Sequence, residues 1–277
     1  MSAAADAANP NQSLWEKGDF TRIAVAMRQS GEALVEGLGI TPGLAVLDLG
    51  CGDGTTAIPA AGRAARVLGV DIARNLLEAG NRRAGALGLS NCQFRQGDAT
   101  HLDGIADRSF DLVVSIFGAM FAPRPLDVAR EMVRVTRRGG RIVMGNWIPG
   151  DPTLASEMLA ISASYMPPPP PGFVSPMLWG VRSEVCDRFT AAGVPRESIS
   201  FAPAIFRFEF PGPPRAFASE FVRFYGPTMN AFESAAKSGR QAEIVAELEA
   251  LFVGQNRSGR EDVTSIPATY LRVTVSL

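Results

Sequence analysis

The segment VLDLGCGDGT, residues 46–55, joins a short apolar run to a glycine-rich turn and decides the fold class of this chain. The apolar run has the length and composition of a buried β-strand, and a helical pattern follows the turn. In an open α/β sheet, ligands bind outside the carboxyl ends of the strands, where such a turn lies. Glycines allow a ligand to approach the backbone there because they carry no Cβ. The segment therefore predicts the first strand and the ligand-binding turn of an α/β protein.

Residues 44–147 repeat this alternation of apolar run, turn and helical pattern, which is typical of a parallel sheet with helices on both faces. The run LVVSIF, residues 112–117, is apolar on both faces, as a central parallel strand should be. We expect strands at 44–49, 67–70, 93–96, 112–117 and 141–147, with helices at 55–64, 73–87 and 126–137, the last ended by the turn at Arg138, Gly139 and Gly140.

The pattern changes after residue 147. Asp151 and Pro152 predict the start of a helix that extends to about Tyr165, and the five prolines that follow predict a rigid connector. Two segments with alternating apolar residues predict antiparallel strands, and two amphipathic helices between them predict a cap over the sheet. The expected elements are a helix at 183–192, strands at 205–210 and 271–277, and cap helices around 217–225 and 244–252.

Composition excludes several classes of function. The chain has 277 residues, with 27 basic and 28 acidic side chains. Its net charge of -1 provides no positive electrostatic potential that would attract nucleic acid or an anionic membrane. Three cysteines without a CxxC pair and a single histidine predict no metal site. The first residues lack the features of a signal peptide, and prolines interrupt the longest uncharged stretch. We therefore expect a cytoplasmic protein without a membrane span.

The chemistry of the turn narrows the choice of ligand. The dinucleotide fingerprint requires glycine at position 55, where this chain has Thr55. Asp48 and Asp53 place negative charge at the turn, which disfavours a pyrophosphate and favours a cationic ligand. Asp71 ends the next strand, where a carboxylate can accept hydrogen bonds from two ribose hydroxyls.

Four further motifs follow along the chain: GVD (69–71), GDA (97–99), SFDLVVS (109–115) and RRGGRIVMGNW (137–147). With these motifs in this order and at this spacing, the chain resembles the class I S-adenosylmethionine (SAM)-dependent methyltransferases over residues 12–277. The resemblance implies SAM as cofactor and a Rossmann-like, doubly wound α/β sheet of seven strands, mostly parallel, with an antiparallel last strand beside the fifth and a helical cap. We expect an N-terminal lid at 1–40, a SAM-binding core at 41–150, and the cap helices with the last two strands at 151–277.

The resemblance also implies the cofactor contacts. Asp48 would hold the ammonium group of the methionyl moiety, Asp71 the ribose, and Asp98 the exocyclic amine of adenine. Two motifs depart from the family pattern: GDG stands where GTG is common, and Thr100 and His101 replace the usual acidic residue after GDA. The full expected set is Asp48, Gly50, Cys51, Gly52, Asp71, Ile72, Gly97, Asp98, Ala99, Ser115, Ile116 and Phe117.

Acceptor contacts are expected from fold analogy, and the nearest resemblance is to small-molecule enzymes similar to the ubiquinone/menaquinone C-methyltransferases. We expect a small, largely apolar or aromatic acceptor, methylated by in-line displacement through orientation and desolvation without a dedicated base. His101 is the only histidine of the chain and a candidate base, because histidine is the commonest general base in enzymes, but its place beyond GDA predicts the adenine end of the site. The motifs are compatible with methylation of a carbon, nitrogen, oxygen or sulfur atom. They do not specify the oligomeric state of the protein. The acceptor candidates are Trp15, Phe20, Phe117, Met120, Phe121, Trp147 and Tyr225.

Two alternatives from other classes share parts of this pattern. A nicotinamide-dependent oxidoreductase would have the same strand, turn and helix, but it should carry glycine at position 55. A methyltransferase-like protein that binds SAM without turnover would keep the cofactor motifs and have a filled acceptor cavity. The state of that cavity therefore distinguishes a binding protein from an enzyme.

Overall fold

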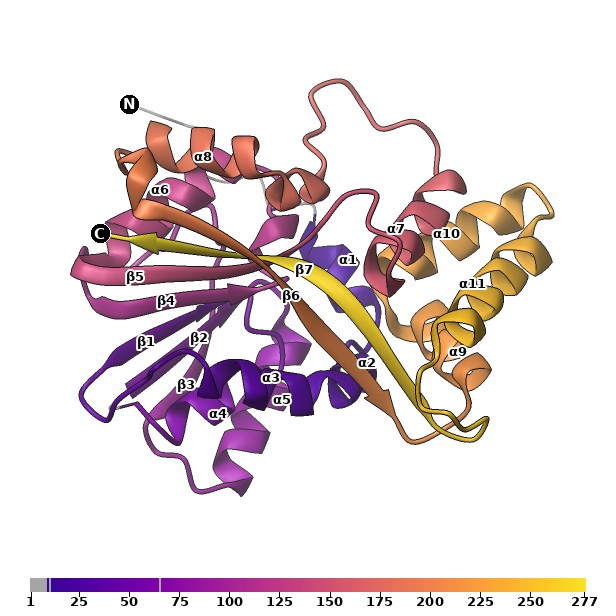
Figure 1. The fold of residues 1–277 in the computed structure, drawn as a ribbon, viewed down its shortest axis with the longest axis horizontal. Helices are drawn as coiled ribbons and strands as arrows, with labels where there is room; N and C mark the ends of the chain where they lie inside the picture. Colours follow the sequence, from indigo (N-terminus) through magenta and orange to yellow (C-terminus); the bar gives the residue numbers. More distant parts are fainter. Residues whose placement is uncertain (1–8, 10, 65) are drawn as a thin grey trace.

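The computed structural model describes residues 9, 11–64 and 66–277 (Figure 1). These residues form one seven-stranded sheet, in the order β3-β2-β1-β4-β5-β7-β6. The strands are β1 Ala45–Leu49, β2 Arg66–Asp71, β3 Cys92–Gln96, β4 Phe110–Ile116, β5 Thr136–Trp147, β6 Ile199–Phe210 and β7 Thr264–Ser276. β1 to β5 pair in parallel, whereas β7 runs antiparallel to both β5 and β6. The expected Rossmann-like fold with its antiparallel last strand is confirmed.

Helices cover both faces of the sheet. Figure 1 shows α3 to α5 on one face, α6 and α8 on the other, and α7 and α9 to α11 grouped beyond one end of the sheet. Their bounds are α1 Asn11–Lys17, α2 Thr21–Ala24, α3 Arg28–Glu36, α4 Ala57–Ala61, α5 Arg74–Ala86, α6 Pro125–Val135, α7 Leu154–Ser164, α8 Arg182–Ala191, α9 Pro214–Phe224, α10 Gly226–Lys237 and α11 Gln241–Gln255, with 3-10 helices η1 Val25–Met27, η2 Ala119–Phe121, η3 Pro176–Gly180 and η4 Arg196–Ser198.

The central strands are buried on both faces, which is why their sequences are mostly apolar. Along β1, Leu47 packs in the cluster that contains Met132 of α6, whereas Val46 packs in the cluster that contains Ile58 of α4. Successive side chains of a strand point to opposite faces, so one run of apolar residues serves two helical layers.

β6 and β7 are longer than expected and pair over their whole length, from Ile199 opposite Val275 to Phe210 opposite Thr264. The pair extends past the other strands toward the cap helices (Figure 1). The cap also contains three helices between these strands rather than the expected two. The chain is extended at Tyr225 between α9 and α10. Pro227 explains this break, because a proline ring in a continuous helix would clash with the carbonyl four residues earlier.

Three helix boundaries also differ from those expected. α6 ends at Val135 because Thr136 is extended and pairs with Phe110, so the following glycines belong to β5 and do not cap the helix. α7 begins at Leu154, since the Asp151 carboxylate accepts a hydrogen bond from the backbone N–H of Thr153 at 2.9 Å outside the helix. α4 is also shorter than expected.

The N-terminal helix α1 lies between the sheet and the cap. Glu16 accepts a hydrogen bond from the backbone N–H of Arg74 at 3.1 Å, and Lys17 pairs with Glu233 of α10 at 2.6 Å. Of the expected lid at 1–40, residues 1–8 and 10 lie outside the described residues. Within the described ranges, no helix is long and apolar enough to cross a membrane. The cytoplasmic location expected from the sequence stays a prediction.

Candidate cofactor and acceptor site

One cavity opens at the carboxyl ends of the parallel strands, with a volume of about 1240 Å³ that includes its opening to solvent. It has two parts of different chemistry. The glycine half is formed by the turn after β1 and by the ends of β2 and β3, and it carries the acidic residues Asp48, Asp71 and Asp98. The aromatic half lies toward the cap and is lined by Trp15, Phe20, Phe117, Phe121, Trp147, Phe206, Phe208, Phe221 and Tyr225.

The glycine turn is held against the loop after β4. Gly50 has φ +70°, and its backbone packs so closely on Gly118 that a Cβ on Gly118 would lie 2.2 Å from the Gly50 carbonyl oxygen. Gly52 has φ +55°, and a Cβ there would meet no atom within 4 Å, although the residue lines the cavity. Gly50 therefore serves close packing, and Gly52 leaves an open cradle beside the backbone.

Asp48 is a buried carboxylate whose hydrogen bonding is incomplete. Its side chain is 1% exposed, and it accepts a hydrogen bond from the backbone N–H of Ala57 at the start of α4. Burial, together with the nearby Asp71, raises the pKa of Asp48 to about 8. Its Oδ2 atom has no hydrogen-bond partner among the described residues. A buried acceptor without a partner beside a cavity fits a cationic donor from a ligand.

Asp71 organises the backbone around the same turn. One carboxylate oxygen accepts from the Gly52 N–H at 2.8 Å and the other from the Ala73 N–H at 2.9 Å. Burial raises its pKa, and these backbone donors oppose that rise. A carboxylate has about four lone-pair positions, so acceptor capacity remains for the hydroxyls of a ligand.

Asp98 follows β3 and closes a tight turn. Its Oδ1 accepts from both the N–H and the hydroxyl of Thr100 at 2.8 Å, and its Oδ2 accepts from the Asn9 amide at 3.0 Å. The residue is thereby tied to the segment that precedes α1. Asn9 also lines the cavity, and its contribution was not expected from the sequence.

Asp53 does not add a free negative charge to the turn, contrary to the interpretation of the sequence. Its carboxylate is 1% exposed and pairs with Arg28 of α3 at 3.2 Å and with Arg83 of α5 at 3.1 Å. Two guanidinium groups therefore compensate this charge, and the departure from the GTG pattern is accommodated by an ion-pair cluster.

The aromatic half is built around Phe117, which is the first residue after β4. Its φ of +63° is unusual for a bulky side chain, and its backbone N–H donates to the Gly145 carbonyl at 2.9 Å. This conformation stacks the Phe117 ring on Trp147, with centroids 3.6 Å apart and planes 8° apart. A second aromatic group forms where Trp15 meets Phe121 at 5.1 Å and Tyr225 at 5.8 Å.

Comparison with known proteins connects this geometry to a family. Residues 47–144 match the family model described as a methyltransferase domain. An uncharacterised protein of Mycobacterium tuberculosis is 35% identical over 244 residues, which cover 88% of this chain and 85% of that protein. The demethylmenaquinone methyltransferase of Renibacterium salmoninarum is 34% identical over 134 residues, which cover 47% of this chain and 54% of that enzyme.

Solved structures show the same fold. The YcgJ protein of Bacillus subtilis has a TM-score of 0.57 at 18% identity, with 90% of this chain and 98% of that chain covered. A geranyl diphosphate methyltransferase, solved with GPP and sinefungin, has a TM-score of 0.51 at 22% identity, with 90% and 76% covered. The chain belongs to the class I SAM-dependent methyltransferases. SAM is therefore the cofactor of this methyltransferase.

The structure brings together most of the residues that the sequence of the methyltransferase singled out. The cavity is lined by eleven expected cofactor residues, Asp48, Gly50, Cys51, Gly52, Asp71, Ile72, Gly97, Asp98, Ala99, Ile116 and Phe117, and by the acceptor candidates Trp15, Phe20, Phe121, Trp147 and Tyr225. Two expected residues do not line it. The Ser115 hydroxyl accepts from the backbone N–H of Ala119 at 3.0 Å, and Met120 is buried in the core.

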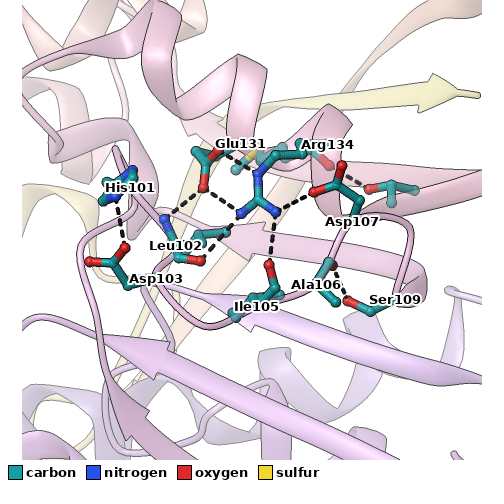
Figure 2. Close-up of polar contacts among 11 residues, drawn as sticks. His101, Leu102, Asp103, Ile105, Ala106, Asp107, Ser109, Glu131 and Arg134 are labelled. Atoms are coloured by element: carbon teal, nitrogen blue, oxygen red, sulfur yellow. Dashed lines mark hydrogen bonds and ion pairs between the residues drawn. The ribbon is translucent and has the colours of Figure 1, made fainter. Parts of the chain in front are cut away.

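His101, the candidate base, lies at the surface of the methyltransferase and does not line the cavity. Its side chain is 66% exposed, and its Nε2 lies 2.7 Å from an Asp103 oxygen (Figure 2). The neighbouring polar network joins Arg134 of α6 to Glu131 at 2.7 Å and to Asp107 at 2.7 Å. Because Arg134 also donates to the carbonyls of the loop after His101, this network holds that loop on α6.

Several residues of the methyltransferase cavity were missed by sequence reasoning. From the sequence, Phe206 and Phe208 were expected only to lie on the buried face of a strand. An alternating apolar pattern predicts burial, but it does not tell whether the side chains face the core or a ligand cavity. Their place in the cavity follows from the length of β6, which carries them past the other strands. The other missed lining residues with side chains larger than alanine are Asn9, Asn11, Ile23, Met27, Leu49, Thr55, Thr56, Val70, Leu76, Met158 and Phe221.

Proposed function

We propose that this methyltransferase transfers the methyl group of SAM to a small, largely apolar or aromatic metabolite by in-line displacement. The observation that carries the proposal is the continuity of one cavity from the acidic glycine half to the aromatic half. A donor held in the first half and an acceptor held in the second would share one cavity. Such an arrangement removes much of the entropic cost of bringing two reactants together.

The glycine half offers the groups that would hold the cofactor. Asp48 would accept from the methionyl ammonium group, and its unpartnered Oδ2 supports this role. Asp71 would accept from the ribose hydroxyls with the lone pairs that Gly52 and Ala73 leave free. Asp98, followed by Ala99, would face the adenine ring at the end of β3. The open cradle at Gly52 gives the cofactor close access to the backbone.

The remaining residues expected to contact SAM are uncharged and would surround it. Gly50, Cys51, Ile72, Gly97, Ile116 and Phe117 line the same half or its border with the aromatic half, which supports their contact with the cofactor. Ser115, whose backbone carbonyl was expected to face the cofactor, is the exception, because the residue does not line the cavity.

The aromatic half would orient the acceptor and exclude water. SAM supplies a methyl group on a positively charged sulfur when it is bound. The described residues of the aromatic half include no histidine, lysine or carboxylate that could act as a base, and burial raises the pKa of the Tyr225 phenol, which stays protonated near neutral pH. Orientation and desolvation are therefore the means of catalysis that these residues support.

A relative and the state of the cavity support an enzyme with a small acceptor. One relative is named for the small molecule demethylmenaquinone. The alternative of a SAM-binding protein without turnover predicts a filled acceptor cavity, whereas the aromatic half is part of the open cavity. The oxidoreductase alternative lacks support because position 55 is threonine and the family is that of methyltransferases.

A labelling experiment tests the proposed function. The pure protein is incubated with methyl-labelled SAM and a metabolite extract, and the small molecules that gain label are identified by mass spectrometry. We expect label in an apolar or aromatic metabolite, and at least about tenfold less label with the Asp71→Ala variant when SAM is far from saturating. SAM binding by calorimetry without label transfer to any metabolite would contradict turnover and favour the binding protein.

A further inference from the structure

From the charges and donors of the aromatic half, we infer that the acceptor is an uncharged aromatic compound, that the Tyr225 hydroxyl hydrogen-bonds its polar group, and that carboxylate and phosphate compounds are rejected. This inference rests on the proposed function, because it assigns the acceptor class for the same site. Its support comes from three features of the cavity wall.

The first feature is a continuous aromatic wall contributed by elements far apart in sequence. Trp147 lies 6.3 Å from Phe208, which lies 6.3 Å from Phe221. Phe221 lies 5.4 Å from Tyr225, and Tyr225 lies 5.8 Å from Trp15. Each of these residues lines the cavity. Aromatic side chains at such spacing offer edges and faces to another ring, so the wall fits an aromatic guest better than a flexible polar one.

The second feature is the absence of positive side chains among the described residues that line the cavity. No lysine, arginine or histidine is among the lining residues of the described chain. Residues 1–8, 10 and 65, which the structure does not describe, contain none of these three residue types. A carboxylate or phosphate buried here would therefore lack a cationic side chain from this chain, and an unpaired buried anion is costly.

The basic residues that closely follow Trp15 and Phe20 in sequence form ion pairs with the cap helices. Lys17 follows Trp15 in α1, but its ammonium group pairs with Glu233 and donates a hydrogen bond to the Asn230 side-chain oxygen at 2.8 Å. Arg22 follows Phe20, but it pairs with Glu220 at 3.0 Å. Both cations therefore fasten the N-terminal helices to the cap and do not serve the cavity.

The third feature is the Tyr225 hydroxyl. Tyr225 is buried, and its hydroxyl makes no hydrogen bond within the described part of the chain. Burial raises its pKa, so the group is a neutral phenol that can both donate and accept. A ligand with one hydroxyl or carbonyl group could pair with it, and the ring of that ligand would meet the aromatic side chains of this half. Tyr225 is thus a specificity-determining residue for the acceptor.

Three probes of the same ring system test the inference by calorimetry at pH 7, with the protein saturated by S-adenosylhomocysteine, which has no sulfonium charge. They are 2-naphthol, 2-naphthoate and 2-naphthylmethylammonium, which are neutral, anionic and cationic. We expect 2-naphthol to bind at least about tenfold more tightly than 2-naphthoate, because the cavity offers an anion no cationic side chain. Equal or tighter binding of 2-naphthoate overturns the inference, and so does tighter binding of the ammonium probe than of 2-naphthol or the failure of all three probes to bind.

The Tyr225→Phe variant tests the hydroxyl while it keeps the ring. We expect its affinity for 2-naphthol to fall by about threefold to tenfold, as for the loss of one hydrogen bond, with the affinity for naphthalene unchanged. An unchanged affinity for 2-naphthol overturns the role of Tyr225. In both proteins, binding of S-adenosylhomocysteine is measured first. Its loss would contradict the cofactor site, whereas normal cofactor binding with the wrong probe preference would contradict only the acceptor class.

Discussion

The substitution Asp48→Asn should stabilise the cofactor-free protein, and it should do so increasingly as the pH rises. Asp48 is 1% exposed, and burial is the main cause that raises its pKa from an ordinary 3.8 to about 8. Asparagine keeps an oxygen that can accept from the Ala57 N–H, but it cannot ionise. The variant therefore removes a buried charge and keeps the shape of the side chain.

The sign and size of the effect follow from proton linkage. Between about pH 4 and pH 8 the native state holds a proton on Asp48 that the unfolded chain has lost, so the free energy of unfolding falls as the pH rises. One such proton changes it by about 1.36 kcal/mol for each pH unit. From pH 5 to pH 8 the limit is about 4 kcal/mol. Even about 1 kcal/mol would move the melting temperature of a chain of this size by about 2–4 °C.

The assay is thermal unfolding of the wild type and the variant at pH 5 and pH 8, without cofactor. We expect the melting temperature of Asp48→Asn to exceed that of the wild type by a larger margin at pH 8. The matched control is Asp187→Asn, which changes an exposed aspartate of α8 and should give the same small difference at both pH values. A margin for Asp48→Asn that stays constant or shrinks between pH 5 and pH 8 would refute the reasoning.

Four further outcomes are expected. Asp71→Ala should weaken the binding of SAM and of its demethylated product by at least about tenfold in calorimetry, with the fold intact by circular dichroism; an unchanged affinity would count against the ribose contact. His101→Ala should keep its turnover within about tenfold at saturating SAM, because the imidazole is exposed and outside the cavity; a true general base would cost about a hundredfold or more. Gly118→Ala should lower the melting temperature more than Gly52→Ala, because only the former places a Cβ 2.2 Å from a backbone oxygen; equal losses would contradict the close packing. Amides 13–25 should exchange more slowly with SAM than without it if the N-terminal segment is a lid, and equal protection would identify it as fixed packing.

Much of the core could be predicted because its signals are local in the sequence. The glycine turn after β1 requires residues without a Cβ, and the apolar runs of β1 and β4 are needed wherever a strand is buried on both faces. The acidic residues Asp71 and Asp98 follow successive strands, and parallel strands bring their carboxyl ends to one edge of the sheet. For these reasons the residues alone predicted the parallel α/β core and the ligand-binding turn, and the family resemblance that these motifs carry predicted SAM and the seven-stranded sheet.

Tertiary structure decided how charges are compensated. Asp48 and Asp53 lie five residues apart and look alike in sequence, but Asp48 keeps an unpartnered oxygen while Asp53 is paired with Arg28 and Arg83. The two guanidinium groups come from α3 and α5, on either side of the turn in sequence. No local pattern shows that these helices converge on one carboxylate, so the sequence could not separate the two roles.

Tertiary structure also decided which apolar side chains face the cavity. The alternating pattern predicted that Phe206 and Phe208 are buried, and the motif after β4 singled out both Phe117 and Met120. Residues of a core and residues of a ligand-cavity wall are both apolar and buried, so these patterns could not tell them apart. The positive φ of Phe117 turns its ring onto Trp147, whereas Met120 turns into the core. The sequence by itself determined the parallel core and its glycine turn through local constraints on the backbone, and its motifs indicated the cofactor through their resemblance to a family. The acceptor chamber depends on the long-range pairing of β6 with β7 and on the docking of the cap, and only the folded chain decides these.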